Sequence, residues 1–425
     1  MKLADIIETF ISGDWGEETV AEDTPNSVFC IRGADIVPIT NHCFNGIPQR
    51  FVCDKTIENK TLKAGDLIIE KSGGSPTQST GRIVYVSEDM IKAKGNVVCS
   101  NFCTAFRVKA GWNPLYVYYF WQNVYNHGAF FNFEGKTSGI KNLQLDNALS
   151  AIDIEYLPLE KQNQIVASLA SIDEKIKVNR QINDNLEAMA KQLYDYWFVQ
   201  FDFPNEEGKP YKSSGEAMVY NERLKREIPI GWTCCSIKEM CDINKKTINK
   251  DEHKQIEYLD TGSITQGHIS NTEIYSVDMA PSRAQRKVED LSILYSSVRP
   301  RLLHYGILST PKENFIVSTG FVTLDAKYKK MALMVYYYLT SNTITEHLAS
   351  IADTAVSSYP SISPDDIAYL DIVIPSNDII QKYNDIVEPM FRKMSTLRKE
   401  IDSLTKRRDE LLPLLMNGQA SVNSD

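Results

Sequence analysis

Apolar residues recur at alternating steps of three and four positions in two long stretches of the chain, and this spacing predicts two long amphipathic helices. Ten of the eleven seam positions in the distal stretch are apolar or aromatic: Ile380, Tyr383, Val387, Met390, Met394, Leu397, Ile401, Leu404, Arg408, Leu411 and Leu415. A seam sustained over about five heptads is typical of a coiled coil. Pro389 lies inside this stretch and is expected to kink the helix or to mark its first turn.

The earlier stretch has its own seam, which we assign to Ile165, Leu169, Ile172, Ile176, Asn179, Ile182, Leu186, Met189, Leu193 and Tyr196. The step after Asn179 breaks the alternation and predicts local overwinding. The residues from Glu160 to Val199 would form a helix about 60 Å long at about 1.5 Å per residue. Two such helices are expected to pack on each other antiparallel. The alternative is that each one lies independently on its own domain.

The chain contains an internal repeat with a period of roughly 220 residues. Four segments of the first half, at 63–74, 96–106, 115–123 and 152–159, have counterparts in the same order at 287–300, 314–324, 335–342 and 370–376. In each half, short runs rich in β-branched and aromatic residues, separated by Gly, Pro, Asn and Asp, precede the long helix. We therefore interpret one half as a diverged duplicate of the other.

This organisation predicts an α+β protein with two pseudo-symmetric mixed α/β domains, separated by two long antiparallel coiled-coil helices. The predicted boundaries are a first domain at 1–156, a central long helix at 157–200, a connection at 201–231, a second domain at 232–374, a distal long helix at 375–420 and a tail at 421–425.

Composition narrows the class of protein. The chain has 425 residues, 43% of them hydrophobic, and a formal net charge of -9 from 46 basic and 55 acidic side chains. This balance argues against coating nucleic acid or an anionic membrane by bulk charge. The sequence also shows no signal-peptide pattern, no apolar run long enough to span a membrane, and eight cysteines without zinc-binding spacing. We expect a cytoplasmic protein with reduced thiols.

Positive charge collects in one window of each half. Basic residues outnumber acidic ones around Arg82, Lys92, Lys94, Arg107 and Lys109, and again around Arg283, Arg286, Lys287, Arg299 and Arg301. Arginine reads guanine edges, whereas Ser side chains and backbone N–H groups hold phosphates. The segments 72–75 with Arg82, and 299–304, are therefore suited to contacts in a DNA groove. The competing interpretation is an ordinary solvated face.

Motifs that resemble catalytic sites are incomplete. Asn113-Pro114-Leu115-Tyr116 lacks the second proline of an adenine methyltransferase loop, so we interpret it as the capped start of a helix. The tripeptide at 135–137 lacks the upstream glycine of a phosphate-binding loop. Asp365-Asp366 is expected at a helix start, and the six histidines show no metal spacing. The sequence predicts no catalytic residue and no metal site.

Taken together, these features resemble the specificity (S) subunit of type I restriction-modification systems along essentially the whole chain. The resemblance is carried by the segments at 157–162, 197–204 and 227–232, and by 65–74 and 295–300 within the two domains. It implies a subunit without an active site, whose two target-recognition domains each read one half of a bipartite, gapped DNA site. A pseudo-two-fold repeat suits half-sites about one DNA turn apart, near 34 Å.

The resemblance also implies particular contacts and partners. The expected DNA-binding residues are Lys71, Ser72, Ser75, Arg82, Tyr295, Arg299, Arg301 and His304. Two methyltransferase subunits would dock on the helices, whose seam includes Ile172, Ile176, Leu186, Leu193, Leu397, Ile401, Leu404 and Leu411. Translocase-endonuclease subunits would complete the complex. No cofactor is expected in this chain, and S-adenosylmethionine, ATP and Mg²⁺ would be bound by the partners, in a bacterial or archaeal cytoplasm.

Three other functions fit parts of the pattern. A specificity subunit of a related methylation-only phage-defence system would have the same sequence features. An autonomous adenine DNA methyltransferase would need the loop and cofactor turn that Leu115 and its surroundings lack. A coiled-coil scaffold with protein-binding globular halves would show no sequence-specific DNA binding.

Overall fold

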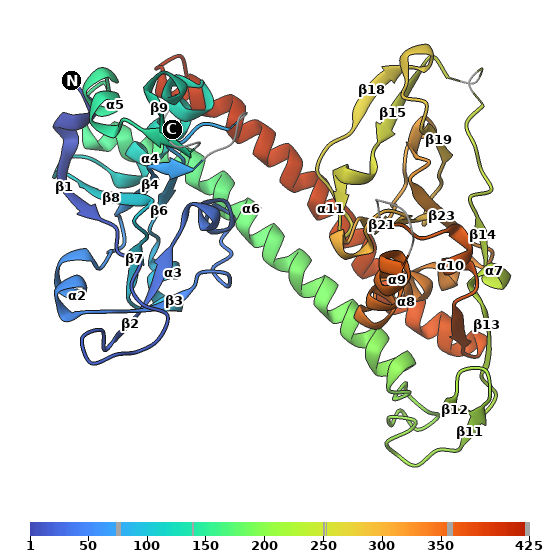
Figure 1. Ribbon diagram of the computed structural model, residues 1–425. Helices are drawn as coiled ribbons and strands as arrows, with labels where there is room; N and C mark the ends of the chain where they lie inside the picture. Colours follow the sequence, from blue (N-terminus) through green and yellow to red (C-terminus); the bar gives the residue numbers. More distant parts are fainter. Residues whose placement is uncertain (74–77, 138–139, 250, 252, 355–359, 421–425) are drawn as a thin grey trace. The chain divides into compact units, whose positions relative to one another are not determined.

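The computed structural model describes residues 1–73, 78–137, 140–249, 251, 253–354 and 360–420. Contacts divide the chain into two compact units, Met1–Asn179 with Glu400–Asp425, and Arg180–Lys399. Two long helices, α6 (Leu159–Tyr194) and α11 (Asn377–Met416), contribute to both units (Figure 1). None of the helices in the described part of the chain is both long enough and apolar enough to span a membrane.

The first unit contains two principal sheets. The antiparallel sheet has the order β1-β8-β4-β6, with strands Ile7–Ser12, Cys103–Val108, Leu67–Glu70 and Ile83–Tyr85. The second sheet, β3-β2-β7, has strands Gln49–Val52, Asn26–Ile31 and Val97–Cys99, and its β2-β7 pair is parallel. A small sheet, β5-β10-β9, is formed by Ser72–Gly73, Ile140–Leu143 and Glu134–Thr137. Alternation of buried and exposed residues is weak in β4, because all four of its residues are buried.

Five short helices complete the first unit: α1 Ile36–Thr40, α2 Asp54–Lys60, α3 Glu88–Lys94, α4 Pro114–Asn126 and α5 Leu145–Ala151. The Asn113 side chain accepts hydrogen bonds from the N–H groups of Leu115 and Tyr116, and Pro114 occupies the first helical position of α4. This confirms that the Asn-Pro tetrapeptide is a capped helix start. Its helix delivers Trp121 into the core, where the indole stacks on Phe130.

The second unit repeats this plan. Its antiparallel sheet, β14-β23-β20-β21, has strands Cys241–Ile243, Phe321–Ala326, Ile293–Ser296 and Tyr305–Ile307. The sheet β18-β15-β22-β19 has strands Glu273–Ser276, Gln255–Leu259, Phe315–Ser318 and Ala284–Lys287, with a parallel β15-β22 pair. Three two-stranded ladders are β13-β24 (Thr233–Ser236, Asp371–Ile374), β16-β17 (Ile264–Thr265, His268–Ile269) and β11-β12 (Met218–Asn221, Arg226–Pro229). The short helices are α7 Ile237–Met240, α8 Ala332–Leu339, α9 Asn342–Thr354 and α10 Pro364–Ala368.

The duplication extends to individual backbone hydrogen bonds. The N–H of Glu70 donates to the carbonyl of Arg82 at 2.9 Å, and the N–H of Ser296 donates to the carbonyl of His304 at 2.9 Å. Three more N–H to carbonyl bonds of the first half have a counterpart in the second half. The bond from Val86 to Asp66 matches that from Leu308 to Ser292, the bond from Phe29 to Asn96 matches that from Glu257 to Asn314, and the bond from Lys109 to Ile6 matches that from Lys327 to Met240. The two halves therefore share one backbone frame, which confirms the internal repeat.

Side chains on this frame have diverged. Gly65 and Leu291 occupy matched turns before β4 and β20, and both have positive φ angles, +97° and +67°. A left-handed backbone is unfavourable for leucine. The Leu291 side chain is, however, only 6% exposed. Burial of its side chain offsets the conformational cost.

Helices α6 and α11 run antiparallel. In the first unit, Asp173 pairs with Arg408 at 3.0 Å and Lys175 pairs with Glu400 at 3.4 Å. Residue numbers thus rise along one helix while they fall along the other. In the second unit, Glu187 pairs with Arg398 at 3.3 Å and the Phe198 ring lies 4.8 Å from that of Tyr383, in the same sense. Independent helices on separate domains are therefore ruled out, and the antiparallel prediction is confirmed.

The predicted seam of α6 is wrong in its second half. Ile182, Met189 and Tyr196 are 37%, 52% and 36% exposed, whereas Asn183 and Ala190 are buried. Asn179, Asn183, Leu186 and Ala190 continue the inward face in alternating steps of four and three, so no skip occurs after Asn179, and the next buried residue, Tyr194, follows at a step of four. The seam was assigned from large apolar residues. It therefore missed Asn183, which is polar, and Ala190, which is small.

Helix α11 departs from its predicted seam near the C-terminal end. Leu411 is 36% exposed and Leu412 is 3% exposed, so the buried face moves by one residue after Arg408. A strict seven-residue repeat has 3.5 residues per turn, whereas a straight helix has 3.6. The positions of such a repeat therefore rotate gradually away from the buried face of a straight helix. Pro389 lies on an exposed position within α11, which begins at Asn377, so this proline does not mark the first turn.

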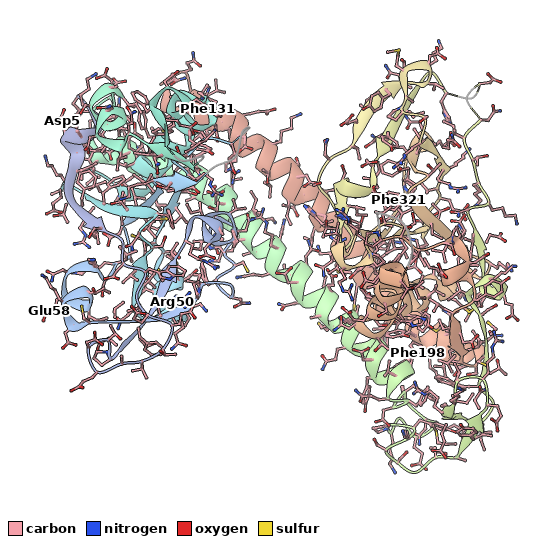
Figure 2. All side chains as sticks on the ribbon, viewed as in Figure 1. Asp5, Arg50, Glu58, Phe131, Phe198 and Phe321 are labelled. Atoms are coloured by element: carbon pink, nitrogen blue, oxygen red, sulfur yellow. The ribbon has the colours of Figure 1, made fainter. Side chains whose placement is uncertain are left out.

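After α6, a π-helical turn at Asp195–Val199 leads into an aromatic cluster. Figure 2 shows Phe198 at this end of α6, and the Trp232 ring lies 4.7 Å from Phe203 and 5.6 Å from Phe201. The hairpin β11-β12 falls within the predicted connection. The cluster fixes the path of the chain from the helix into the second domain.

Candidate nucleic-acid interface

In the first domain, Arg82 belongs to an ion pair with Glu70. The Arg82 Nε and Nη2 atoms donate to the two Glu70 carboxylate oxygens at 2.8 and 2.6 Å, and Nη2 also donates to the Gly33 carbonyl at 3.0 Å. The Glu70 hydrogen bonds raise the pKa of the Arg82 guanidinium. Because Glu70 is 2% exposed, this bidentate pair supports the domain, and the placement of Arg82 does not favour a base contact.

Two glycines make room for this pair. A Cβ atom at Gly33 or Gly73 would lie 2.7 or 2.6 Å from the Glu70 Oε1 atom. Gly73 also has a φ angle of +145°, which L side chains rarely adopt. Gly73 thus has a packing role beside Glu70. A lone acid at the end of the apolar run 67–70 was the sequence signal that could have revealed the pair.

Lys71 and Ser72 lie beside the pair at the end of β4. The backbone of Lys71 bridges two elements, because its N–H donates to Phe102 at 2.8 Å and its carbonyl accepts from Leu143 at 2.7 Å. Ser72 Oγ donates to Asn142 Oδ1 at 2.5 Å. Both residues are half-buried, so their side chains reach the surface of the domain. The fourth predicted residue, Ser75, lies outside the described residues.

The second domain presents a strained loop after β20. Arg299 and Leu303 both have left-handed backbones, with φ angles of +48° and +56°, on either side of the 3-10 turn Pro300–Leu302. The N–H of Arg299 donates to the Pro360 carbonyl at 2.9 Å. Arg299, Arg301 and Leu302 are exposed, whereas Pro300 is buried and anchors the loop. Strain of this kind is found where the surrounding structure fixes a loop for contact.

Arg301 and His304 of this loop have neighbours that orient their side chains. Arg301 donates to Asp353 at 2.5 Å and to Glu346 at 3.3 Å, both on α9. The His304 Nδ1 atom lies 2.6 Å from the Ile264 carbonyl oxygen and 3.2 Å from Thr265 Oγ1. Exposed ion pairs of this kind add little stability.

Tyr295 lies in the core. Its side chain is 1% exposed, its ring stacks 5.8 Å from that of Tyr305, and burial raises its pKa to about 12. A ring in this position supports the strand that carries the loop. Its placement does not support a direct contact with DNA.

The matched backbone hydrogen bonds make Arg82 and His304 equivalent positions in the two domains. The sequence pattern instead groups Arg82 with Arg299, because both belong to locally basic windows. Most other cations of the first window are also paired within the domain: Arg107 forms a bidentate pair with Asp66, and Lys109 Nζ donates to the Asp5 carbonyl at 2.7 Å. Local charge therefore overestimates the cations that this window presents to solvent.

The predicted docking residues lie mostly between the helices. Ile176, Leu397 and Ile401 are buried, and Ile172, Leu186, Leu193 and Leu404 are half-buried. Leu411 is exposed. The seam therefore holds the pair together. The exposed residues Ile182 and Met189 of α6 and Tyr196 of the following π-helical turn, seven positions apart, form a separate apolar stripe.

Within the described ranges, no group of three or more His, Cys, Asp or Glu side chains could hold a metal ion. All eight cysteines are free thiols, and four of them, Cys30, Cys99, Cys103 and Cys241, are buried. Burial raises the pKa of the Cys103 thiol to about 11, so this thiol is poorly suited to nucleophilic attack.

A family model of the type I restriction modification DNA specificity domain matches residues 53–188 and 229–406 of the chain. The chain belongs to this family. The two matched regions fall in the two duplicated halves, and each includes most of one long helix. The family resemblance carried by the segments at 157–162, 197–204, 227–232, 65–74 and 295–300 is therefore confirmed.

Individual relatives are more distant. The chain is 26% identical over 285 residues to the specificity subunit of the type I restriction enzyme MjaIX from Methanocaldococcus jannaschii, with 65% of this chain and 62% of the relative covered. It is 24% identical over 164 residues to the HindI specificity subunit from Haemophilus influenzae, with 38% and 36% covered. The chain thus spans less than two thirds of either curated relative.

One solved structure has the same fold along the whole chain. The S subunit of a type I restriction-modification system from M. genitalium matches with a TM-score of 0.57 and 14% identity, covering 100% of this chain and 96% of that one. At this identity the likeness concerns the fold alone.

Proposed function

We propose that this chain is the DNA sequence-recognition subunit of a type I restriction-modification complex. The observation that carries the proposal is the backbone frame that occurs twice in a member of the DNA specificity family. Two copies of one frame with different surface side chains suit a bipartite site whose half-sites differ in sequence. The exposed loop at 299–304, with two arginines on a braced backbone, supplies groove-reading chemistry in the second domain.

The chain itself is proposed to be non-catalytic. Two methyltransferase subunits and translocase-endonuclease subunits would supply the chemistry, with S-adenosylmethionine, ATP and Mg²⁺ bound by them, in the cytoplasm of a bacterium or archaeon. An autonomous adenine methyltransferase is disfavoured because the Asn113 side-chain oxygen accepts from the Leu115 and Tyr116 N–H groups and caps the start of α4, and the Asn113 amide nitrogen donates to Asn163. The net charge of -9 also favours DNA binding in a complex, where partners neutralise many phosphates.

The decisive experiment maps methylated adenines in cells with and without this gene. A bipartite, gapped motif that loses methylation when the gene is deleted supports the proposal. Methylation that is unchanged contradicts it. Methyl transfer by the purified chain without a partner would favour the autonomous enzyme, and a reconstituted complex without sequence-specific DNA binding would favour a protein scaffold.

Arg299 gives a residue-level test. We expect Arg299→Ala to relax one half-site by about 1 to 3 kcal/mol in discrimination, if the guanidinium makes a bidentate base contact. The measurement is competitive binding of the complex to duplexes altered in one half-site at a time. Lys312→Ala is the control, because Lys312 is an exposed cation paired with Glu257 elsewhere in the same domain. Equal losses at both half-sites would contradict a specific role for Arg299.

The exposed stripe gives a test of partner docking. Met189→Asp is expected to weaken assembly with the methyltransferase by at least about tenfold, since a charge at the centre of an apolar interface is costly. Its stability should change little, because Met189 is 52% exposed. Ala188→Asp introduces the same charge on a neighbouring exposed position outside the stripe. Analytical ultracentrifugation of mixtures measures assembly, and equal effects of the two variants would rule out the stripe as the docking surface.

A further inference from the structure

Arg398 joins three parts of the second unit. From α11, its Nη2 atom lies 3.3 Å from the Glu187 carboxylate of α6, and its Nη1 atom donates to the Gly267 carbonyl at 2.8 Å. Gly267 is the turn of the β16-β17 hairpin, where Gln266 and Gly267 have φ angles of +47° and +75°. Two successive positive φ angles are typical of a tight two-residue hairpin turn. One guanidinium therefore ties this hairpin to both long helices.

The same hairpin is fastened to the loop that carries Arg299. The N–H groups of Gln266 and Gly267 donate to the carbonyls of Leu303 and Tyr305 at 2.9 and 2.7 Å. His304 bonds to the Ile264 carbonyl on the first hairpin strand. The loop at 299–304 is thus connected to Arg398 through a few consecutive hydrogen bonds.

Packing leaves little freedom in this connection. A Cβ atom at Gly306 of β21 would lie 2.5 Å from Ile264 Cδ1 and 3.2 Å from the Gly267 Cα atom. A Cβ atom at Gly267 would lie 3.2 Å from Arg398 Nη1 and 3.4 Å from the Tyr336 hydroxyl. Since both close approaches depend on glycine, the hairpin cannot move away from β21 or from Arg398 without losing packing.

We propose that Arg398 is a positioning residue for DNA recognition, which fixes the 299–304 loop against the helix pair through the Gly267 carbonyl. This inference rests on the proposed function of the chain. Arg398 does not itself contact DNA in this account. It sets the orientation of the loop, so that the helices that bind partners also determine how the second domain presents its cations.

The test uses the complex with its methyltransferase and a library of random-sequence duplex DNA, with bound sequences identified by sequencing. Cross-linking to bound duplex assigns each half-site to one domain. Arg398→Ala is expected to lower the sequence preference at the second domain's half-site between about 2-fold and about 30-fold, the range for coupled networks. The first domain's preference should stay unchanged. Arg398→Lys keeps a donor for Gly267 and should restore part of the loss.

Exchanging the charges separates positioning from simple stability. The double variant Glu187→Arg with Arg398→Glu restores an ion pair between the helices, but a glutamate cannot donate to the Gly267 carbonyl. Its thermal stability should recover while its second half-site preference stays low. Lys175→Ala removes a different pair between the helices, in the first unit, and is expected to change neither preference.

Three results would overturn the assignment: an unchanged preference in Arg398→Ala, equal losses at both half-sites, or full recovery of recognition in the charge-exchanged variant. Failure of the proposed function gives a different pattern. In that case the wild-type complex itself would enrich no sequence from the library.

Discussion

Leu412→Asp is expected to lower the free energy of unfolding by about 4 kcal/mol or more, whereas Leu411→Asp should cost only about 0.5 kcal/mol. Leu412 is 3% exposed and packs in the core formed by the first domain and the end of α11, so the variant buries a carboxylate and removes an apolar contact. Leu411 is 36% exposed. The two variants share the same chemistry and nearly the same place in the helix.

Urea denaturation followed by circular dichroism measures this difference, and binding of the methyltransferase reports whether the helix pair survives. Leu404→Asp, at a half-buried seam position, should fall between the two variants. A larger effect for Leu411→Asp than for Leu412→Asp would mean that the strict seven-residue seam describes α11 better than the buried face observed here.

Arg82→Ala is expected to destabilise the first domain by about 3 to 5 kcal/mol, because removing one partner of a buried ion pair leaves an uncompensated charge. The stranded group is Glu70, whose side chain is 3% exposed. Calorimetry of the variant should show a lower unfolding temperature than that of the wild-type chain. A change in DNA sequence preference can be interpreted only after this loss of stability is known.

The double variant Glu70→Gln with Arg82→Ala provides the control for this result. It removes the buried charge and should recover much of the lost stability, since a neutral amide is easier to desolvate than a carboxylate. If Arg82→Ala keeps wild-type stability and relaxes one half-site, Arg82 acts on DNA and the ion pair is dispensable.

The two long helices and the internal duplication were predictable from the sequence, because each depends on a pattern of residues that recurs many times along the chain. The helices predicted at 157–200 and 375–420 are observed at 159–194, with a π-helical turn to 199, and at 377–416. The duplication was predictable because similar segments return in the same order in both halves of the chain. These signals are averages over many residues, so single exceptions do not remove them.

Individual side chains were harder to predict. Asn183 and Ala190 face inward while Ile182 and Met189 face outward, because helix geometry and the available volume decide burial as well as hydrophobicity. Arg82 looked like a surface cation until its contact with Glu70, twelve residues earlier, was known. The expected DNA contacts of Ser75 and Arg299 stay predictions, and a complex with DNA would test them.

The matched backbone bonds have a consequence for how such a protein can change over time. In one half, Asp66 pairs with Arg107, and in the other the corresponding Ser292 pairs with Asp325. Because main-chain bonds preserve the frame, substitutions in one copy need not be balanced in the other. New sequence preferences can therefore evolve one half at a time, with the untouched half keeping its own preference.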